Sequence, residues 1–294
     1  MASKYLMNMG LSPFVLSQGR LTIASGLTII WLALTRPQAL RIQKRHLWHF
    51  ALLGVVGMAG VNVCYFEAIS RIATAAAILV EYTAPVLIAL YARFFMAQRM
   101  GLMGWTALFL ALAGCYFVVG GYNINLFHMN STGFIWGLGA AFTYSFYIIY
   151  SEYLLRVYGP WTILLYALIF GALSWNIVLG PGTLPKMGWN ITSWTLIFLC
   201  SSFGTIVPFG LFAWGVELLR STRATIVATF EPISAGVIAF VALGERLALL
   251  QIVGGVAVIV SVVLIQREKE LDELAPAMLK QQASTRSITI QRGN

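Results

Sequence analysis

Charged side chains are scarce in this sequence. Asp, Glu, Lys and Arg make up 10% of the 294 residues, whereas 59% of the residues are hydrophobic. A soluble domain has about 25% charged residues, and its core cannot absorb so much apolar surface. Apolar stretches of about 20 residues recur along the chain, and each can cross the roughly 30 Å hydrocarbon core of a bilayer. The composition therefore excludes a soluble domain and predicts a multi-pass integral membrane protein, with the lipid bilayer as a partner.

The chain also lacks the residue patterns of enzymes, metal sites and cofactor sites. It has no HExxH or GxSxG motif, and Cys64, Cys115 and Cys200 lie in apolar stretches without metal-ligand spacing. His46 and His49 lie close to Arg45 at the start of a predicted helix, where membrane topology and solvation explain them. We expect no enzyme activity, no metal and no cofactor.

The formal net charge of +9 does not indicate nucleic acid as a partner. The Lys and Arg residues stand singly or in small groups in the short gaps between apolar stretches. This placement is typical of membrane topology signals rather than of a phosphate-binding surface. The sequence gives no indication of the oligomeric state.

The hydropathy pattern predicts an all-α polytopic protein with nine spans. We expect them at residues 11–35, 46–70, 72–96, 102–121, 131–155, 160–180, 191–218, 222–243 and 247–266. The segment from Arg267 onward is polar and contains Pro276. We predict that this tail, residues 267–294, begins as a short helix and ends disordered.

An internal repeat relates the two parts of the chain. With a constant shift of 147 residues and no gaps, spans and loops coincide, which indicates duplicated units at residues 1–121 and 131–266. Identical residues at this spacing include the pairs Pro13/Pro160, Gly57/Gly204, Ala77/Ala224, Val80/Val227, Pro85/Pro232 and Arg99/Arg246.

The repeat predicts two halves of nominally five helices in opposite orientations. A unit with an odd number of spans returns to the membrane from the other side, as in the inverted repeats of secondary transporters. The span at 131–155 would correspond to positions before residue 8, so most of a first helix has no counterpart. A truncated gene model is favoured over a natural variant that lacks this helix.

The distribution of basic residues predicts a cytoplasmic C-terminus, in a bacterial inner membrane. In this orientation the outer side receives only Lys4, Arg71, Lys186 and Arg246 among the Lys and Arg residues. The larger set falls on the cytoplasmic side, as the positive-inside rule requires: Arg36, Arg41, Lys44, Arg45, Arg93, Arg99, Arg156, Arg220, Arg223 and the tail.

Two carboxylates, Glu81 and Glu231, lie near the middle of their predicted spans. Charges at this depth cost about 2.5 to 3.5 kcal/mol to insert and are functional candidates by default. Their positions in the repeat differ by three residues, nearly one helical turn. They could bind a substrate amine or exchange a proton, because a buried carboxyl group holds its proton more readily. A structural role, with each glutamate hydrogen-bonded to a neighbouring helix, stays open.

Further candidates surround these glutamates. Arg20 lies within a span, where it could hold a substrate carboxylate; an ion pair that fixes helix packing is favoured. Pro85 and Pro232 should break equivalent helices and free a backbone carbonyl, which suits a gating role. Polar and aromatic side chains that could line a cavity, or fill helix contacts instead, are Asn62, Tyr65, Tyr82, Tyr144, Tyr147, Phe212 and Trp214.

Two segments resemble the EamA repeats of the drug/metabolite transporter superfamily. They are AAAILVEYTAPVLIALYARFFMAQR and RATIVATFEPISAGVIAFVALGERLALLQIVGGVAVIVSVVLI, of which the second, with Glu231-Pro232 and Gly244-Glu245-Arg246, is the more specific. Ser12-Pro13-Phe14 followed by Arg20 is similar to the family's second helix. The resemblance implies ten helices, cytoplasmic termini, a central cavity and export of amino acids, related metabolites or drugs. The first repeat departs from it with Ala97-Gln98-Arg99 in place of Gly-Glu-Arg.

The favoured hypothesis is a secondary exporter of small metabolites that works by alternating access between the two halves. Protons are candidate coupling ions. An importer or a sugar-nucleotide exchanger of the same superfamily remains an alternative, as does a protein of another class, a channel or a membrane-embedded enzyme. Saturable counterflow would distinguish a carrier from a channel.

Overall fold

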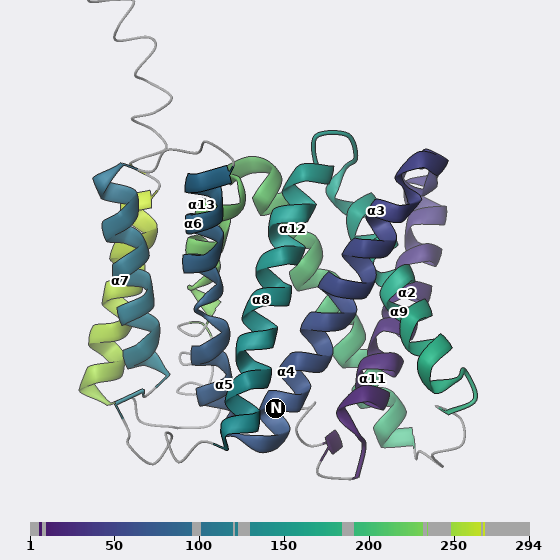
Figure 1. The fold of residues 1–294 in the computed structure, drawn as a ribbon, viewed down its shortest axis with the longest axis horizontal. Helices are drawn as coiled ribbons and strands as arrows, with labels where there is room; N and C mark the ends of the chain where they lie inside the picture. Colours follow the sequence, from purple (N-terminus) through teal and green to yellow (C-terminus); the bar gives the residue numbers. More distant parts are fainter. Residues whose placement is uncertain are drawn as a thin grey trace, which may run out of the picture.

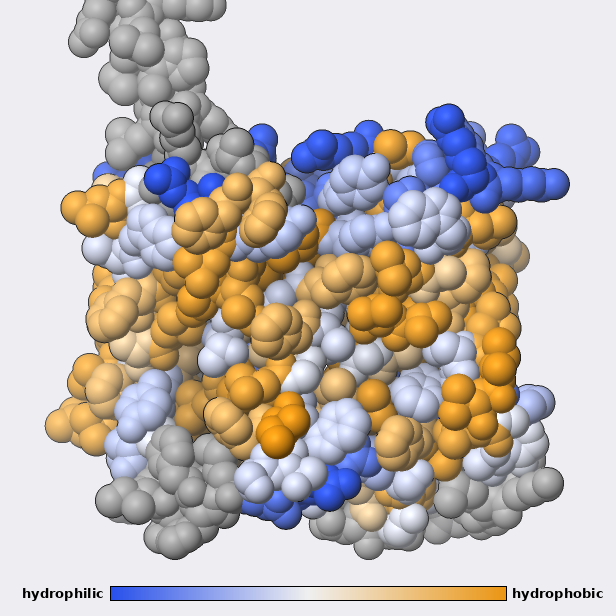
Figure 2. Space-filling view, viewed as in Figure 1, coloured by the Kyte–Doolittle hydropathy of each residue, from blue (hydrophilic) through white to orange (hydrophobic). Residues whose placement is uncertain are grey.

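The computed structural model describes residues 6–7, 10–95, 101–119, 121–122, 130–183, 191–231, 234, 248–265 and 267. Over these residues the regular structure is entirely helical, and the long helices run roughly parallel to one another (Figure 1). Figure 2 shows an apolar belt between two more hydrophilic ends. The predicted fold class, an all-α polytopic membrane protein, is confirmed.

The first half begins with α2 (Pro13–Thr35). Ser12 caps this helix by accepting a hydrogen bond from the Val15 backbone N at 3.3 Å, and proline occupies the first turn, where no backbone donor is needed. The 3₁₀ turns η1 (Pro37–Leu40) and η2 (Lys44–His46) then lead into the second long helix. The remaining elements are α3 (Leu47–Leu52), the π-helix η3 (Leu53–Ala59), α4 (Gly60–Arg71), α5 (Thr74–Glu81), α6 (Ala84–Phe95) and α7 (Leu102–Val118).

The second half repeats this order after one additional helix, α8 (Ser131–Leu154). The elements that follow it are α9 (Pro160–Leu179), α11 (Ile191–Ser201), the π-helix η5 (Ser202–Ile206), α12 (Val207–Leu219), α13 (Ser221–Ala228) and an apolar helix at Leu249–Ile265. A shift of 147 residues carries α5 onto α13 with identical limits, and it carries α7 onto the helix Leu249–Ile265. The two π-helices also fall on corresponding positions.

The two halves run in opposite directions through the bundle. The start of α2 lies beside the end of α9, where Gln18 Nε2 donates to Asn176 Oδ1 at 3.0 Å and to the Gly180 carbonyl at 2.9 Å. At the other end, the rings of Trp31 and Trp161 pack edge to face with centroids 4.7 Å apart. Helices α2 and α9 are equivalent in the repeat, so their antiparallel packing is the inverted relation that the odd number of spans predicts (Figure 1).

Most of the predicted spans coincide with helices. Six helices of the described chain are long and apolar enough to cross a membrane, and α7 and Leu249–Ile265 are shorter apolar helices. The span predicted at 72–96 is divided by a break between α5 and α6. Of the span predicted at 222–243, the structure describes α13, the turn after it, Glu231 and Ser234, and the rest lies outside the described residues.

Close backbone contacts hold the two halves together. A Cβ atom on Gly54, in the π-helix η3, would lie 2.5 Å from Phe170 Cβ and 2.8 Å from the carbonyl oxygen of Ala167 on α9. A buried apolar cluster around Leu21, Met58 and Leu164 adjoins this contact. Since lipid supplies no hydrophobic drive between helices, such small-residue contacts determine how closely they pack.

Candidate functional site

Each half has a helix break at the same repeat position. In the first half, Glu81 is the last residue of α5, and Tyr82 and Thr83 form a turn before α6. Pro85 has no N–H, so the Glu81 carbonyl loses its usual helical partner. Both the backbone N and the Oγ1 of Thr83 turn back to the Val80 carbonyl, at 3.1 and 2.7 Å. A proline-linked break was expected here.

The equivalent break follows α13. Thr229 and Phe230 form the turn, the counterparts of Tyr82 and Thr83 under the shift of 147 residues, and Glu231 follows directly. The second gating candidate, Pro232, lies outside the described residues. Both glutamates therefore stand at helix breaks, where the backbone of a membrane protein can be irregular if it lines a cavity.

The two breaks bring charges from both halves together. Glu81 lies close enough to Glu231 and to Arg20 to interact with both electrostatically. Three tyrosines join the same electrostatic cluster: Tyr65 interacts with both glutamates and Arg20, and Tyr82 and Tyr144 each interact with both glutamates. Helices α2, α4, α5 and α8, the turn after α5 and the break after α13 thus contribute to one polar centre. We call it the glutamate cluster: Arg20, Tyr65, Glu81, Tyr82, Tyr144 and Glu231.

Arg20 is held by the opposite half rather than by an acidic side chain. Its Nε donates to Thr205 Oγ1 at 2.5 Å, and its Nη2 donates to the carbonyl oxygen of Gly204. Its guanidinium carbon also lies 5.5 Å from the centroid of the Phe66 ring. The described carboxylates include none within 4.0 Å of Arg20; the ion pair found is Arg71 with Glu67, at 2.7 Å. The favoured expectation of an ion pair is therefore not what the described residues show.

The other predicted candidates differ in their surroundings. Phe212 packs against Tyr144, with ring centroids 6.1 Å apart, and so adjoins the glutamate cluster. Asn62 is buried and donates to the Met58 carbonyl at 2.8 Å, and Tyr147 is 1% exposed and packs on Phe209. Trp214 is 50% exposed on α12. Asn62 and Tyr147 serve helix contacts here, and Trp214 lies at the surface.

Comparison with known proteins identifies the family. The sequence matches the EamA-like transporter family over residues 1–120 and 131–267. The chain belongs to this family. It is therefore a multi-pass integral membrane transporter, for which a small-molecule substrate and a lipid environment are the expected partners.

Relatives of this EamA-like chain are named as transporters. An uncharacterized transporter of Archaeoglobus fulgidus is 30% identical over 74% of this chain and 76% of the relative. The threonine/homoserine exporter RhtA of Escherichia coli is 26% identical over 84% of this chain and 82% of RhtA. A crystal structure with 19% identity superposes with a TM-score of 0.71, covering 90% of this chain and 91% of that one, and it supports the fold.

The partners of Arg20 in this EamA-like protein are a hydroxyl and a backbone carbonyl, which the sequence pattern did not predict. The π-helix η5 frees backbone carbonyls from regular α-helical bonding and presents that of Gly204 to Arg20. The only sequence signal was the pairing of Gly204 with Gly57, which lies in the equivalent π-helix η3. Among the described residues, no group of three or more His, Cys, Asp and Glu side chains could hold a metal ion.

Proposed function

We propose that this protein exports amino acids or closely related small metabolites by alternating access around the glutamate cluster. The observation that carries the proposal is that Glu81, at the helix break of the first half, lies close enough to interact both with Arg20 and with Glu231, at the equivalent break of the second half. The name of RhtA, a threonine/homoserine exporter, supports an amino acid as the substrate class. The duplicated, inverted architecture supports alternating access.

The charges of the cluster suit a zwitterion. A guanidinium has five N–H groups, and two hydrogen bonds, to Thr205 and Gly204, fix its plane. The hydrogen bonds of the described residues leave the remaining N–H groups available to a substrate carboxylate. Arginine binds carboxylates well in a bidentate geometry. Glu81 is half-buried and Glu231 is exposed. Either carboxylate can receive the substrate ammonium group or a proton.

The helix breaks give the cluster a means of opening and closing. Pro85 interrupts a helix that would otherwise be a rigid rod, and the second half has an equivalent break after α13, so each half can bend next to its glutamate. In this proposal the breaks act as gates, and the positive-inside rule places the C-terminus in the cytoplasm. Proton exchange at Glu81 and Glu231 couples export to the proton gradient.

The test is counterflow of labelled threonine and homoserine in proteoliposomes, with and without a pH gradient. Glu81→Gln and Glu231→Gln keep the shape of the side chain but remove its charge and its proton site. We expect saturable flux in the parent protein and at least a tenfold loss in each variant, about the cost of losing one hydrogen bond to a charged group, 1.5 to 3 kcal/mol. Glu217→Gln, at an exposed position near the end of α12, is the matched control and should transport normally.

Three outcomes would count against the proposal. Equal flux in the parent, Glu81→Gln and Glu231→Gln would make both glutamates structural. Flux that does not saturate, with no counterflow, would indicate a channel. Saturable flux that does not respond to a pH gradient would leave the carrier in place and remove the proton from the mechanism.

A further inference from the structure

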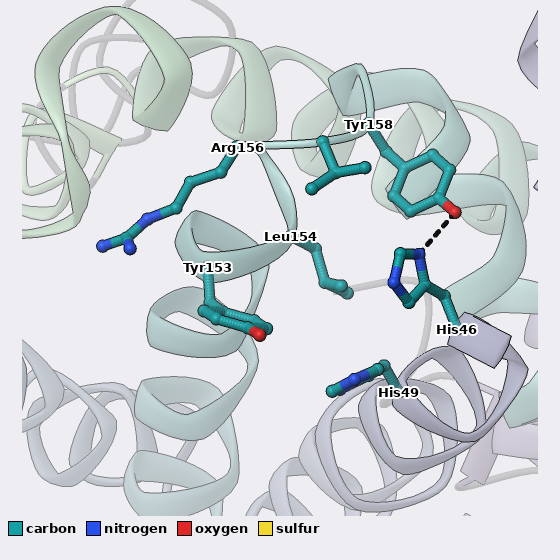
Figure 3. Close-up of a pocket in the computed structure, with 7 residues that line it drawn as sticks. His46, His49, Tyr153, Leu154, Arg156 and Tyr158 are labelled. Carbon is teal, nitrogen blue, oxygen red and sulfur yellow. Dashed lines mark hydrogen bonds between the residues drawn. The ribbon is translucent and has the colours of Figure 1, made fainter. Parts of the chain in front are cut away.

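A small pocket lies where the two halves meet at one end of the bundle. Its lining residues belong to other segments of the chain than the two helix breaks. It is lined by His46 and His49 from the start of the second long helix and by residues of the α8–α9 junction. Figure 3 shows both histidines facing Tyr153 and Leu154 across the cavity. The lining residues are His46, His49, Tyr153, Leu154, Arg156, Val157 and Tyr158.

The hydrogen bonds of His46 define how it faces the pocket. The hydroxyl of Tyr158 accepts from the Gln43 backbone N at 3.1 Å and lies 2.7 Å from His46 Nδ1. Because the hydroxyl oxygen of Tyr158 already accepts the hydrogen bond from Gln43, its own hydrogen is free to be donated to His46 Nδ1. His46 then carries its hydrogen on Nε2. Figure 3 shows this second nitrogen turned toward the cavity, where it can donate to a ligand.

Basic residues predominate in the two segments that line the pocket. Residues 36–49 and 153–160 contain no Asp or Glu. The nearby acid, Glu152, accepts from the Ser221 backbone N at 2.9 Å and is thereby directed to α13. The exposed cations are Arg36, Arg41, Lys44 and Arg45 on one side and Arg156 on the other, and hydrophilic side chains gather at this end in Figure 2.

Exposed aromatic side chains adjoin the pocket. Trp48 is 60% exposed and stacks on His49 with ring centroids 3.8 Å apart, and Tyr153 is 48% exposed beneath the Arg156 guanidinium. Tryptophan and tyrosine at this position are typical of the headgroup level of a membrane. A ligand here meets basic side chains and the exposed faces of two aromatic rings.

We propose that this pocket binds the phosphate headgroup of an anionic phospholipid and that the bound lipid bridges the two halves. His46 Nε2 and the His49 ring supply the groups that recognise the phosphate. Arg156, whose guanidinium lies over Tyr153 and away from the two histidines in Figure 3, joins the adjoining basic residues that concentrate anionic lipid at this end of the bundle. The exposed rings of Trp48 and Tyr153 can contact the acyl chains of a lipid, so a lipid should bind more tightly than a free phosphate ion. The proposal does not depend on the identity of the transported substrate.

The test is the thermal stability of the purified full chain in detergent, titrated with phosphatidylglycerol, phosphatidylcholine or inorganic phosphate, with bound lipid counted by native mass spectrometry. We expect phosphatidylglycerol to bind saturably and to raise the melting temperature, and the other two to have no such effect. Arg156→Gln should weaken phosphatidylglycerol binding roughly fivefold. Arg93→Gln, an exposed cation at the end of α6, is the matched control and should bind as the parent does.

A second variant tests the role of the cavity independently of the basic side chains around it. Val157 lines the pocket and is 60% exposed, so Val157→Trp fills the cavity without changing any charge and without burying the new side chain in the core. Saturable lipid binding should be lost. The proposal is overturned if phosphatidylcholine stabilises equally, if Arg93→Gln weakens binding as much as Arg156→Gln, if Val157→Trp binds normally, or if inorganic phosphate alone produces the stabilisation.

Discussion

At the scale of single residues, Arg20 shows how a cation can be held inside a membrane although none of the described carboxylates lies within 4.0 Å of it. Its guanidinium is bonded to Thr205 and Gly204 and lies over Phe66, so its charge is distributed over dipoles and an aromatic ring. The geometry of the guanidinium is thereby fixed before any substrate arrives. A lysine could not replace it, because one ammonium group cannot reproduce the fork of donors.

Thr205→Val should therefore destabilise the protein. Valine has the same shape but leaves the Arg20 Nε without its acceptor in a buried site, a loss of about 1.5 to 3 kcal/mol for a bond to a charged group. The measurement is the melting temperature of the purified protein in detergent.

Thr195→Val is the matched control for that prediction. Thr195 also donates its hydroxyl to a carbonyl one turn earlier, that of Ile191 at 2.8 Å, but it is exposed. Equal melting temperatures for the two variants would show that Arg20 does not depend on Thr205.

At the scale of elements, the two π-helices are the parts that sequence patterns did not predict. Apolar length predicted the long helices, and Pro85 predicted the break after Glu81, because both effects are local. A π-helix depends on what packs against it: η3 lies against α9 through Gly54, and η5 lies against α2 through Arg20. The contacts of His46 and His49 were missed for the same reason, since Tyr158 and Tyr150 come from the other half.

Gly54→Ala tests the packing of η3. The new Cβ would overlap Phe170 and approach the Ala167 carbonyl, and overpacking of this kind costs about 1 to 3 kcal/mol. We expect a lower melting temperature. Gly26→Ala on α2 is the control, because a Cβ there meets nothing within 4 Å, and alanine favours a helix over glycine by roughly 1 kcal/mol. A Gly54→Ala protein as stable as Gly26→Ala would mean that the two halves move apart easily at this contact.

At the scale of the whole molecule, the inverted arrangement places opposite ends of equivalent helices on the same side of the membrane. The basic residues follow this geometry: the short segment between α2 and α3 is rich in them, whereas its repeat counterpart at 183–193 has only Lys186. The apolar frame was duplicated and most of the flanking charge was not. This is why hydropathy and charge together could predict the architecture, while neither could predict the side-chain partners.

Labelling with a membrane-impermeant maleimide tests the orientation. A cysteine at Gln38, exposed in η1, should be labelled only in inside-out membrane vesicles, and a cysteine at Thr132, exposed at the start of α8, only in intact cells. The native cysteines are buried or half-buried, which limits background labelling. Labelling of both positions from one side would contradict the predicted topology.

The two π-helices contact the opposite half in different ways. Ala167, the counterpart of Arg20, meets Gly54 through tight backbone packing, whereas Arg20 meets η5 through hydrogen bonds to Gly204 and Thr205. A perfectly symmetric pair of halves would make the inward-open and outward-open states mirror images of equal energy. In the proposed alternating-access cycle, unequal contacts remove that degeneracy, so one of the two states has the lower energy and the barriers of the forward and return steps differ in height.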